Sequence, residues 1–143
     1  MILRREVIAE RLDHLRAVTR RLAEIRTADL EQFLSAYQLQ WLAERGLQLA
    51  AQSVLDIGAH ILSGHFNAHP SDYEDVIRLL GVHGVIPPPL EKRLRGLGGF
   101  RNILVHGYLE IDAARVYRFL ADESPVFRDF AEAIDAWTDH QSD

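Results

Sequence analysis

The chain has 143 residues, no cysteine and a formal net charge of −5. This length suits one domain, over residues 1–143, with a sizeable core. The lack of cysteine excludes disulfides and thiolate metal sites and is typical of a reducing compartment. No apolar run approaches the roughly 20 residues of a membrane span, and the charged start resembles no signal peptide. We therefore expect a cytoplasmic protein with no membrane attachment.

The distribution of charge matters more than its sum. A net negative charge argues mildly against generic nucleic-acid binding, because phosphate affinity comes from clustered positive charge. However, Lys92, Arg93, Arg95 and Arg101 form a basic tract, while the last twenty or so residues are acidic. A basic face near position 101 is thus compatible with an acidic chain, although most of the arginines can also be read as solvated helix surface.

Residues 4–26 are expected to form the first amphipathic helix. Its apolar residues recur at spacings of three and four, at Val7, Ile8, Leu12, Leu15, Val18, Leu22 and Ile25. Thr27 is the expected cap of a second helix over residues 28–62, with Asp29 and Glu31 in its first turn. This helix would be about 50 Å long if unbroken.

The second helix carries two apolar stripes and one polar line. The early core stripe is expected at Leu30, Phe33, Leu34, Tyr37 and Trp41, and the late one at Leu47, Ala50, Val54, Leu55, Ile57, Ile61 and Leu62. Gly46 and Gly58 would allow another helix to pack closely. Arg45, Gln52, Asp56 and His60 form the polar line, which is either the solvent face or the wall of a polar cleft or interface.

Residues 63–71 are expected to form a loop that contains Gly64 and Pro70. His65 and His69 are four apart, but with no third ligand and with Pro70 breaking the region we expect no metal site. Ser71 is the expected cap of a short helix that ends near Leu80. A triple proline then suits the first turn of a fourth helix, whose apolar residues are Leu90, Leu94, Leu97, Phe100 and Leu104.

Gly98 and Gly99 lie inside that fourth helix, where each costs about 1 kcal/mol relative to alanine. A close contact between helices or between subunits would explain them. The last helix is expected from residue 112 or 113 to Trp137, divided at Pro125 with Ser124 capping the second part. No alternating strand pattern or internal repeat is present. The sequence therefore predicts an all-α, single-domain antiparallel helical bundle with a long second helix.

The segment from Phe100 to Tyr108 is the strongest candidate for chemistry. It places Arg101, Asn102, His106 and Tyr108 in an apolar run. Residues five apart on a helix are separated by about 140°, so Arg101 and His106 would not lie side by side. Gly107 is a natural helix stop and would release the residues beside it from helical directions.

These residue types fit phosphate chemistry. Arginine can bind a phosphoryl oxygen through parallel hydrogen bonds, and histidine transfers protons near neutral pH. No carboxylate within the segment could hold magnesium, which points to a metal-free reaction with a ribose 2′-hydroxyl as nucleophile, and hence to RNA. The alternative from spacing alone is that Arg101 and His106 only stabilise a helix C-terminus, where positive charge is favourable.

The segment Gly98–Tyr108 resembles the signature of the HEPN superfamily of ribonucleases, specifically HepT-like toxins of HepT/MntA toxin–antitoxin systems. Residues 45–58 resemble the long second helix of this family. The tract from Asp72 through the triple proline to Asp112 follows the same order of elements, so the resemblance covers most of the chain.

The resemblance implies a helical homodimer in which the motifs of both subunits meet in a cleft. It implies metal-independent RNA cleavage without a cofactor, with Arg101 and His106 as catalytic residues and Asn102 in support. Asp56 and Arg45 match polar positions of the second helix and are expected near the cleft. Tyr108 matches the tyrosine that an MntA-like nucleotidyltransferase antitoxin adenylylates, which would block the RNA phosphate site by bulk and negative charge.

Two other readings compete with the nuclease. The chain could be a non-catalytic helical module that binds a nucleotide or substrate for a partner nucleotidyltransferase, with Arg101 and Tyr108 in contact with the ligand. It could also be a purely structural dimer. The complete arginine–histidine pair favours the enzyme.

Overall fold

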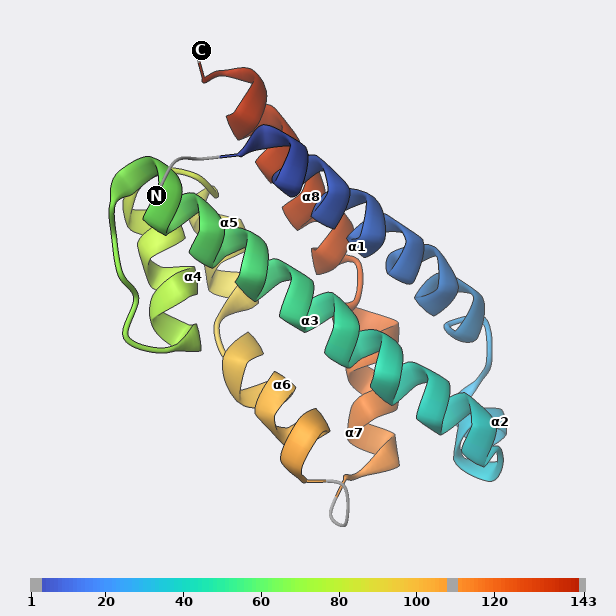
Figure 1. The fold of residues 1–143 in the computed structure, drawn as a ribbon. Coiled ribbons are helices and arrows are strands. Elements are labelled where there is room, and N and C mark those ends of the chain that lie inside the picture. The colour runs from blue at the N-terminus through green and yellow to red at the C-terminus, as the bar shows by residue number, and fades with distance from the viewer. Residues whose placement is uncertain (1–3, 108–110, 142–143) are drawn as a thin grey trace.

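The computed structural model describes residues 4–107 and 111–141, and within these ranges every regular element is helical (Figure 1). The elements are α1 (Arg5–Ile25), α2 (Leu30–Ser35), α3 (Tyr37–Phe66), α4 (Tyr73–Val82), α5 (Pro88–Leu94), α6 (Leu97–His106), α7 (Ala113–Arg118), the π-helical turn η1 (Phe119–Glu123) and α8 (Val126–Asp139). The predicted all-α bundle is confirmed.

The 30-residue helix α3 is the centre of the bundle. It packs most extensively against the antiparallel helix α1 and also against α4, α6, α7 and α8 (Figure 1). The predicted stripe of α1 is buried at Ile8, Leu12, Leu15, Val18 and Leu22. Gly46 and Gly58 mark close approaches, as predicted, because a Cβ on either would lie 2.7 Å from a side-chain atom of α1 or α4, respectively.

The prediction of one unbroken helix over residues 28–62 is wrong at its start. Ala36 is extended, with φ −123° and ψ 98°, and separates α2 from α3. Asp29, rather than Thr27, caps α2, in a capping box with Gln32. The side-chain amide of Gln40 donates to the carbonyls of Phe33 (3.0 Å) and Leu34 (3.1 Å), which satisfies groups that a helix end leaves unpaired.

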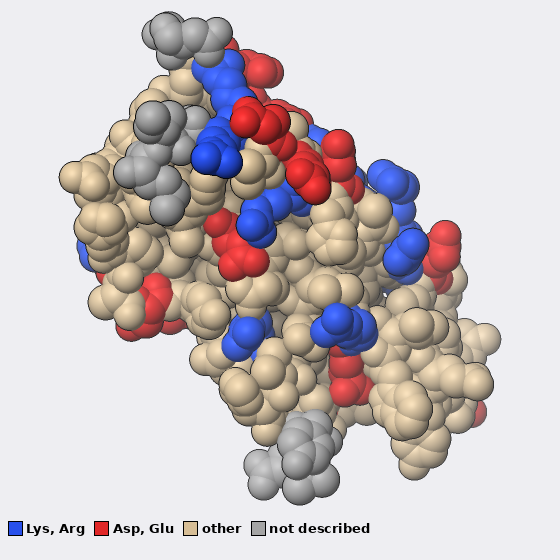
Figure 2. All heavy atoms as spheres, in the orientation of Figure 1, with Lys and Arg blue, Asp and Glu red and all other residues tan. Residues whose placement is uncertain are grey.

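This break changes which residues form the core. Phe33 is fully buried beside the ring of Tyr117 in α7, with centroids 5.3 Å apart, but Tyr37 and Trp41 are 75% and 70% exposed. Leu30 and Leu34, also predicted as core, are exposed as well. This end of the molecule, around α2 and the start of α3, is almost free of charged side chains in the view of Figure 2.

The long helix also ends later than predicted. It continues through Gly64 to Phe66, and Asn67 stops it in the left-handed conformation with φ 51°. The next helix, α4, begins at Tyr73 and is capped by Asp72 rather than by Ser71. It extends to Val82, two residues beyond the predicted end.

The predicted fourth helix is two helices. It begins at the triple proline as expected, but Gly96 adopts φ +86° and separates α5 from α6. The carboxylate of Glu74 in α4 accepts the N–H groups of Gly96 (3.0 Å) and Gly98 (3.1 Å). The N-terminus of α6 is therefore capped by a side chain from another helix. Capping rules that consider only neighbouring residues do not predict this.

The C-terminal segment begins at Ala113, as predicted, with Asp112 as its cap, and is interrupted before Pro125. Ser124 does not cap α8, since its buried hydroxyl donates to the carbonyl of Leu120 at 2.5 Å within the irregular turn. α8 continues to Asp139. None of the described helices is long and apolar enough to cross a membrane.

Candidate active site on helix α6

Helix α6 carries three of the predicted site residues. Arg101 is half-buried, whereas Asn102 and His106 are exposed, and His106 is the last residue of the helix. Gly107 ends α6 as predicted, with its N–H bound to the carbonyl of Ile103 at 2.8 Å. Because α6 is regular through His106, that residue keeps its helical direction, about 140° around the axis and 7.5 Å along it from Arg101. Tyr108 lies outside the described residues.

The guanidinium of Arg101 is held by contacts with three side chains. Its Nε donates to the side-chain oxygen of Gln52 in α3 at 2.7 Å, and Nη1 donates to the side-chain oxygen of Asn102 at 3.1 Å. Its Cζ atom lies 5.3 Å from the ring centroid of Tyr73, within the range of a cation–π contact. Only two of its N–H donors bond to the described residues, which leaves the others for a phosphate.

Gln52 links Arg101 to a carboxylate without a direct ion pair. Its amide nitrogen donates to Asp56 Oδ1 at 2.7 Å, one turn along α3. Asp56 Oδ2 also lies 3.6 Å from Arg11 Nη1 of α1. A neutral amide therefore separates Arg101 from Asp56, and Arg11 offsets the negative charge. Arg101 is oriented while no carboxylate of the described residues neutralises its positive charge.

The middle of the polar line of α3, at Gln52 and Asp56, faces a hollow between α1 and α3. This hollow has a volume of about 560 Å³, and its lining includes Gln52, Asp56, Arg11 and His14. His60 continues the line, accepting the backbone N–H of Arg4 at 3.3 Å. Burial lowers the pKa of His60 below its usual value, with a smaller contribution from the charges of Arg11 and Arg4. Of the two readings of the line, the structure favours a polar cleft.

The start of α6 is fixed against α4 close to this site. A Cβ on Gly98 would lie 2.6 Å from the Cβ of Tyr73, so only glycine fits the approach. The bonds from Glu74 to the first turn of α6 hold the same contact. Gly98 and Glu74 therefore bring the ring of Tyr73 to Arg101. Gly99 has open space around its Cβ position, and contacts with the described residues do not explain it.

Comparison with known proteins identifies the family of the chain. A family model described as ribonuclease HepT-like matches residues 8–134. The chain belongs to this family. It is 33% identical to the tRNA nuclease HepT of Aphanizomenon flos-aquae over 114 residues, which cover 80% of this chain and 73% of the relative. It is 26% identical to the mRNA nuclease HepT of Shewanella oneidensis over 131 residues, or 92% and 98% of the two chains.

The fold of this HepT-like ribonuclease is also that of a solved relative. The tri-AMPylated Shewanella oneidensis HEPN toxin in complex with MNT antitoxin superposes with a TM-score of 0.83 and 26% identity, over 93% of this chain and 99% of that chain. The predicted family and the ribonuclease class are thereby confirmed.

The structure of the HepT-like ribonuclease gathers only some of the predicted site residues. Arg101 and Asn102 are in contact, and Asp56 joins them through Gln52. Arg45 is exposed and lines a different hollow between α1 and α3, beside Arg21 and Glu24. His106 makes no side-chain hydrogen bond or ion pair with the described residues.

The sequence placed Gln52 on the polar line, four residues before Asp56, but did not identify it as the partner of Arg101. Two further partners of this ribonuclease site were not predicted. Tyr73 and Arg11 gave no local signal, because each reaches the site only through the packing of α4 or α1 against α3.

Proposed function

We propose that this HepT-like ribonuclease is the toxin of a toxin–antitoxin pair and cuts RNA internally, without a metal, through Arg101 and His106. The observation that carries the proposal is the state of Arg101. Its guanidinium is oriented by Gln52, Asn102 and Tyr73, yet among the described residues it keeps free donors and has no carboxylate partner. That is the arrangement that phosphoryl-transfer chemistry needs from a positioned cation.

In the proposed reaction the 2′-oxygen of a ribose attacks the adjacent phosphorus. The bond to the leaving 5′-oxygen breaks, which leaves a 2′,3′-cyclic phosphate and a 5′-hydroxyl. Arg101 stabilises the negative charge that builds on the phosphoryl oxygens. His106 is the residue that transfers protons, by accepting the 2′-hydroxyl proton or by donating one to the 5′-oxygen. In these proposed steps Arg101 stabilises the charge and His106 transfers the protons, so no metal ion is required.

The separation of the two residues on α6 favours a site shared by two subunits. About 140° of rotation lies between Arg101 and His106, so one helix presents them in different directions. In a symmetric dimer, Arg101 of each chain can face His106 of its partner, which produces two equivalent sites. We therefore propose that Arg101 of one subunit and His106 of the other act on the same phosphate, supported by Asn102 and the Gln52–Asp56 link.

The proposed regulator is an MntA-like nucleotidyltransferase antitoxin that adenylylates Tyr108. The solved relative is described as AMPylated and bound to an antitoxin, which supports this scheme. Tyr108 lies two residues beyond His106 in the sequence. A phosphate group added there brings negative charge and bulk to the place where an RNA phosphate must bind. The modification would act by local electrostatic and steric exclusion.

Cleavage of RNA by the purified protein in EDTA tests the proposed activity. We expect cleavage by the wild type and its loss in Arg101→Ala and His106→Ala, with unchanged circular dichroism melting. The matched control is Arg20→Ala, an exposed arginine on α1 outside the contacts of Arg101. A strict requirement for added magnesium, or activity that survives both substitutions, contradicts the mechanism.

A separate experiment tests the regulation. After co-expression with a partner nucleotidyltransferase, intact-mass measurement should show AMP adducts, and Tyr108→Phe should lack the adduct at that position. Expression of the toxin alone should arrest growth, and the partner should relieve the arrest. A chain that binds the partner without arresting growth would instead be a non-catalytic module.

A further inference from the structure

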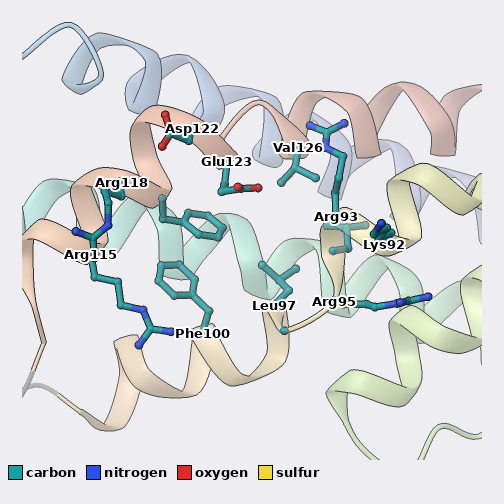
Figure 3. A pocket seen from close by; sticks show the side chains of 13 residues that line it. Lys92, Arg93, Arg95, Leu97, Phe100, Arg115, Arg118, Asp122, Glu123 and Val126 are labelled. Carbon is teal, nitrogen blue, oxygen red and sulfur yellow. The ribbon is translucent and has the colours of Figure 1, made fainter.

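A second hollow, lined by residues of α5, α6, α7 and η1, has a strongly basic lining. We call it the basic groove, lined by Lys92, Arg93 and Arg95 at the end of α5 and by Arg115 and Arg118 of α7 (Figure 3). Its volume is about 700 Å³. Five cationic side chains in one hollow stand out in a chain whose net charge is −5.

Three of these cations are available to a ligand. Arg93 is paired with Asp129 at 2.7 Å and Arg95 with Glu91 at 2.9 Å. Lys92, Arg115 and Arg118 have no ion pair among the described residues. Asp122 and Glu123 also line the groove, from η1, and Figure 3 shows them on the side away from α6. The free positive charge therefore comes from α7 on one side of the groove and from α5 on the other.

The groove has an aromatic floor. The rings of Phe100 in α6 and Phe119 in η1 are stacked, with centroids 4.1 Å apart and planes at 18°. Phe119 is only partly buried, so the floor offers an apolar surface between charged walls. Cationic walls around an aromatic surface are the combination that binds a single nucleic-acid strand, with phosphates on the cations and bases on the rings.

The groove leads toward the proposed active site. A smaller hollow of about 60 Å³ shares Phe100 and Arg115 with it and is lined further along α6 by Ile103. Phe100 directly precedes Arg101, and α6 ends at His106. A strand in the groove would therefore lie alongside the helix that carries both proposed catalytic residues.

We propose that the basic groove binds the phosphodiester backbone of single-stranded RNA next to the cleavage position. The proposal rests on the proposed function for the identity of the strand. Arg115 and Arg118 are three residues apart on α7, and so share one helical face. They bind successive phosphates, and Lys92 of α5 binds the strand from the opposite side of the groove.

Fluorescence anisotropy with a labelled single-stranded RNA tests this directly. The binding protein is full-length His106→Ala in EDTA, so that RNA is bound without being cut. The groove variant adds Arg115→Gln and Arg118→Gln. The matched control adds Arg20→Gln and Arg21→Gln, which remove the same charge from two exposed arginines of α1. A further variant with Arg115→Lys and Arg118→Lys keeps the charge.

The expected result follows from counterion release. Two lost phosphate contacts make the slope of log affinity against log salt shallower by about 1.4, which weakens binding about 25-fold at 0.1 M salt relative to 1 M. The control and the lysine variant should keep most of the salt dependence. If the groove variant weakens no more than the control, or if the parent does not bind the RNA, the proposal is wrong.

Cleavage assays separate this proposal from the proposed function. If the wild type cuts RNA but the groove variant binds it normally, the groove proposal fails and the nuclease mechanism stands. If the groove variant loses binding while wild-type protein cuts no RNA, the groove is an RNA site and the mechanism fails.

Discussion

Gly98 gives the sharpest test of how the bundle positions its proposed active site. A Cβ at this position would lie 2.6 Å from the Cβ of Tyr73 and 3.1 Å from a carboxylate oxygen of Glu74. Gly98→Ala must therefore push α6 away from α4. The same displacement would strain the bond from Glu74 to the Gly98 N–H and move Arg101 from the ring of Tyr73.

Comparison with the adjacent Gly99 makes the destabilisation caused by overpacking at position 98 measurable. It lies in the same turn of α6, but a Cβ there meets nothing within 4 Å. Each alanine gains about 1 kcal/mol of helix propensity over glycine. This gain cancels between the two variants, so their difference reports the overpacking at position 98, about 1–3 kcal/mol. We expect Gly99→Ala to be up to about 1 kcal/mol more stable than the wild type, and Gly98→Ala to be as stable or less stable.

Thermal unfolding followed by circular dichroism is the assay. At about 3 °C per kcal/mol for a chain of this size, the Tm values of the two variants should differ by about 3–9 °C. Unfolding should be measured at two protein concentrations, since a subunit contact at Gly99 would make its effect depend on concentration. Equal Tm values for the two variants, or a Gly98→Ala protein more stable than Gly99→Ala, would refute the close approach of α6 and α4.

Three further predictions concern side chains of α3 and α4. Gln52→Glu should place a carboxylate against Arg101 and lower single-turnover RNA cleavage more than tenfold, whereas the neutral Gln52→Met should lower it less; equal rates for the two would contradict the role of the uncharged amide. Tyr73→Leu should weaken RNA binding about two- to fivefold through loss of 0.5–1 kcal/mol of cation–π support for Arg101, and Tyr73→Phe should not; identical affinities of the two variants would argue against it. The folded-state pKa of His60 is lowered, so the unfolded chain takes up this proton at a higher pH than the folded chain does. The contribution of His60 to the free energy of unfolding is therefore highest above about pH 6.5 and decreases as the pH falls toward the folded-state pKa. Urea unfolding of wild type and His60→Gln should therefore diverge with decreasing pH, to the disadvantage of the wild type, and a pH-independent difference would contradict this assignment.

The sequence predicted the helical class because apolar periodicity is a strong local signal, as the buried stripe of α1 shows. The breaks between helices were harder to predict. Ala36 carries no sequence mark of a helix end, and the chain is extended there because Asp29 and Gln40 satisfy the backbone of α2 from both sides. The same applies to α6, whose first turn is capped by Glu74 from a different helix.

The early stripe of the long helix shows a different limit. Tyr37 and Trp41 have the spacing of core residues but are mostly exposed. Periodicity identifies a face of a helix, and it does not say whether the chain itself covers that face. Once the chain turns at Ala36, Phe33 packs against Tyr117 and the later aromatic residues are left on the surface.

At the site, the motif predicted the residue types but not their supports. Arg101 and Asn102 are adjacent in sequence, and their side chains are hydrogen-bonded. The orientation of Arg101 depends on Gln52, 49 residues earlier in the chain, and on Tyr73 from a third helix. Contacts of that kind follow from tertiary packing, to which a single sequence gives no direct signal.

The central claim is that Arg101 and His106 cut RNA together across a subunit interface. A mixing experiment tests it most directly: Arg101→Ala and His106→Ala proteins are combined in equal amounts, allowed to exchange subunits, and assayed with one labelled RNA in EDTA. Each variant alone should be inactive. Random exchange makes about half of the dimers mixed, each with one intact site, which predicts about a quarter of wild-type activity. Activity of either variant alone, or a mixture as inactive as its components, would contradict the shared site.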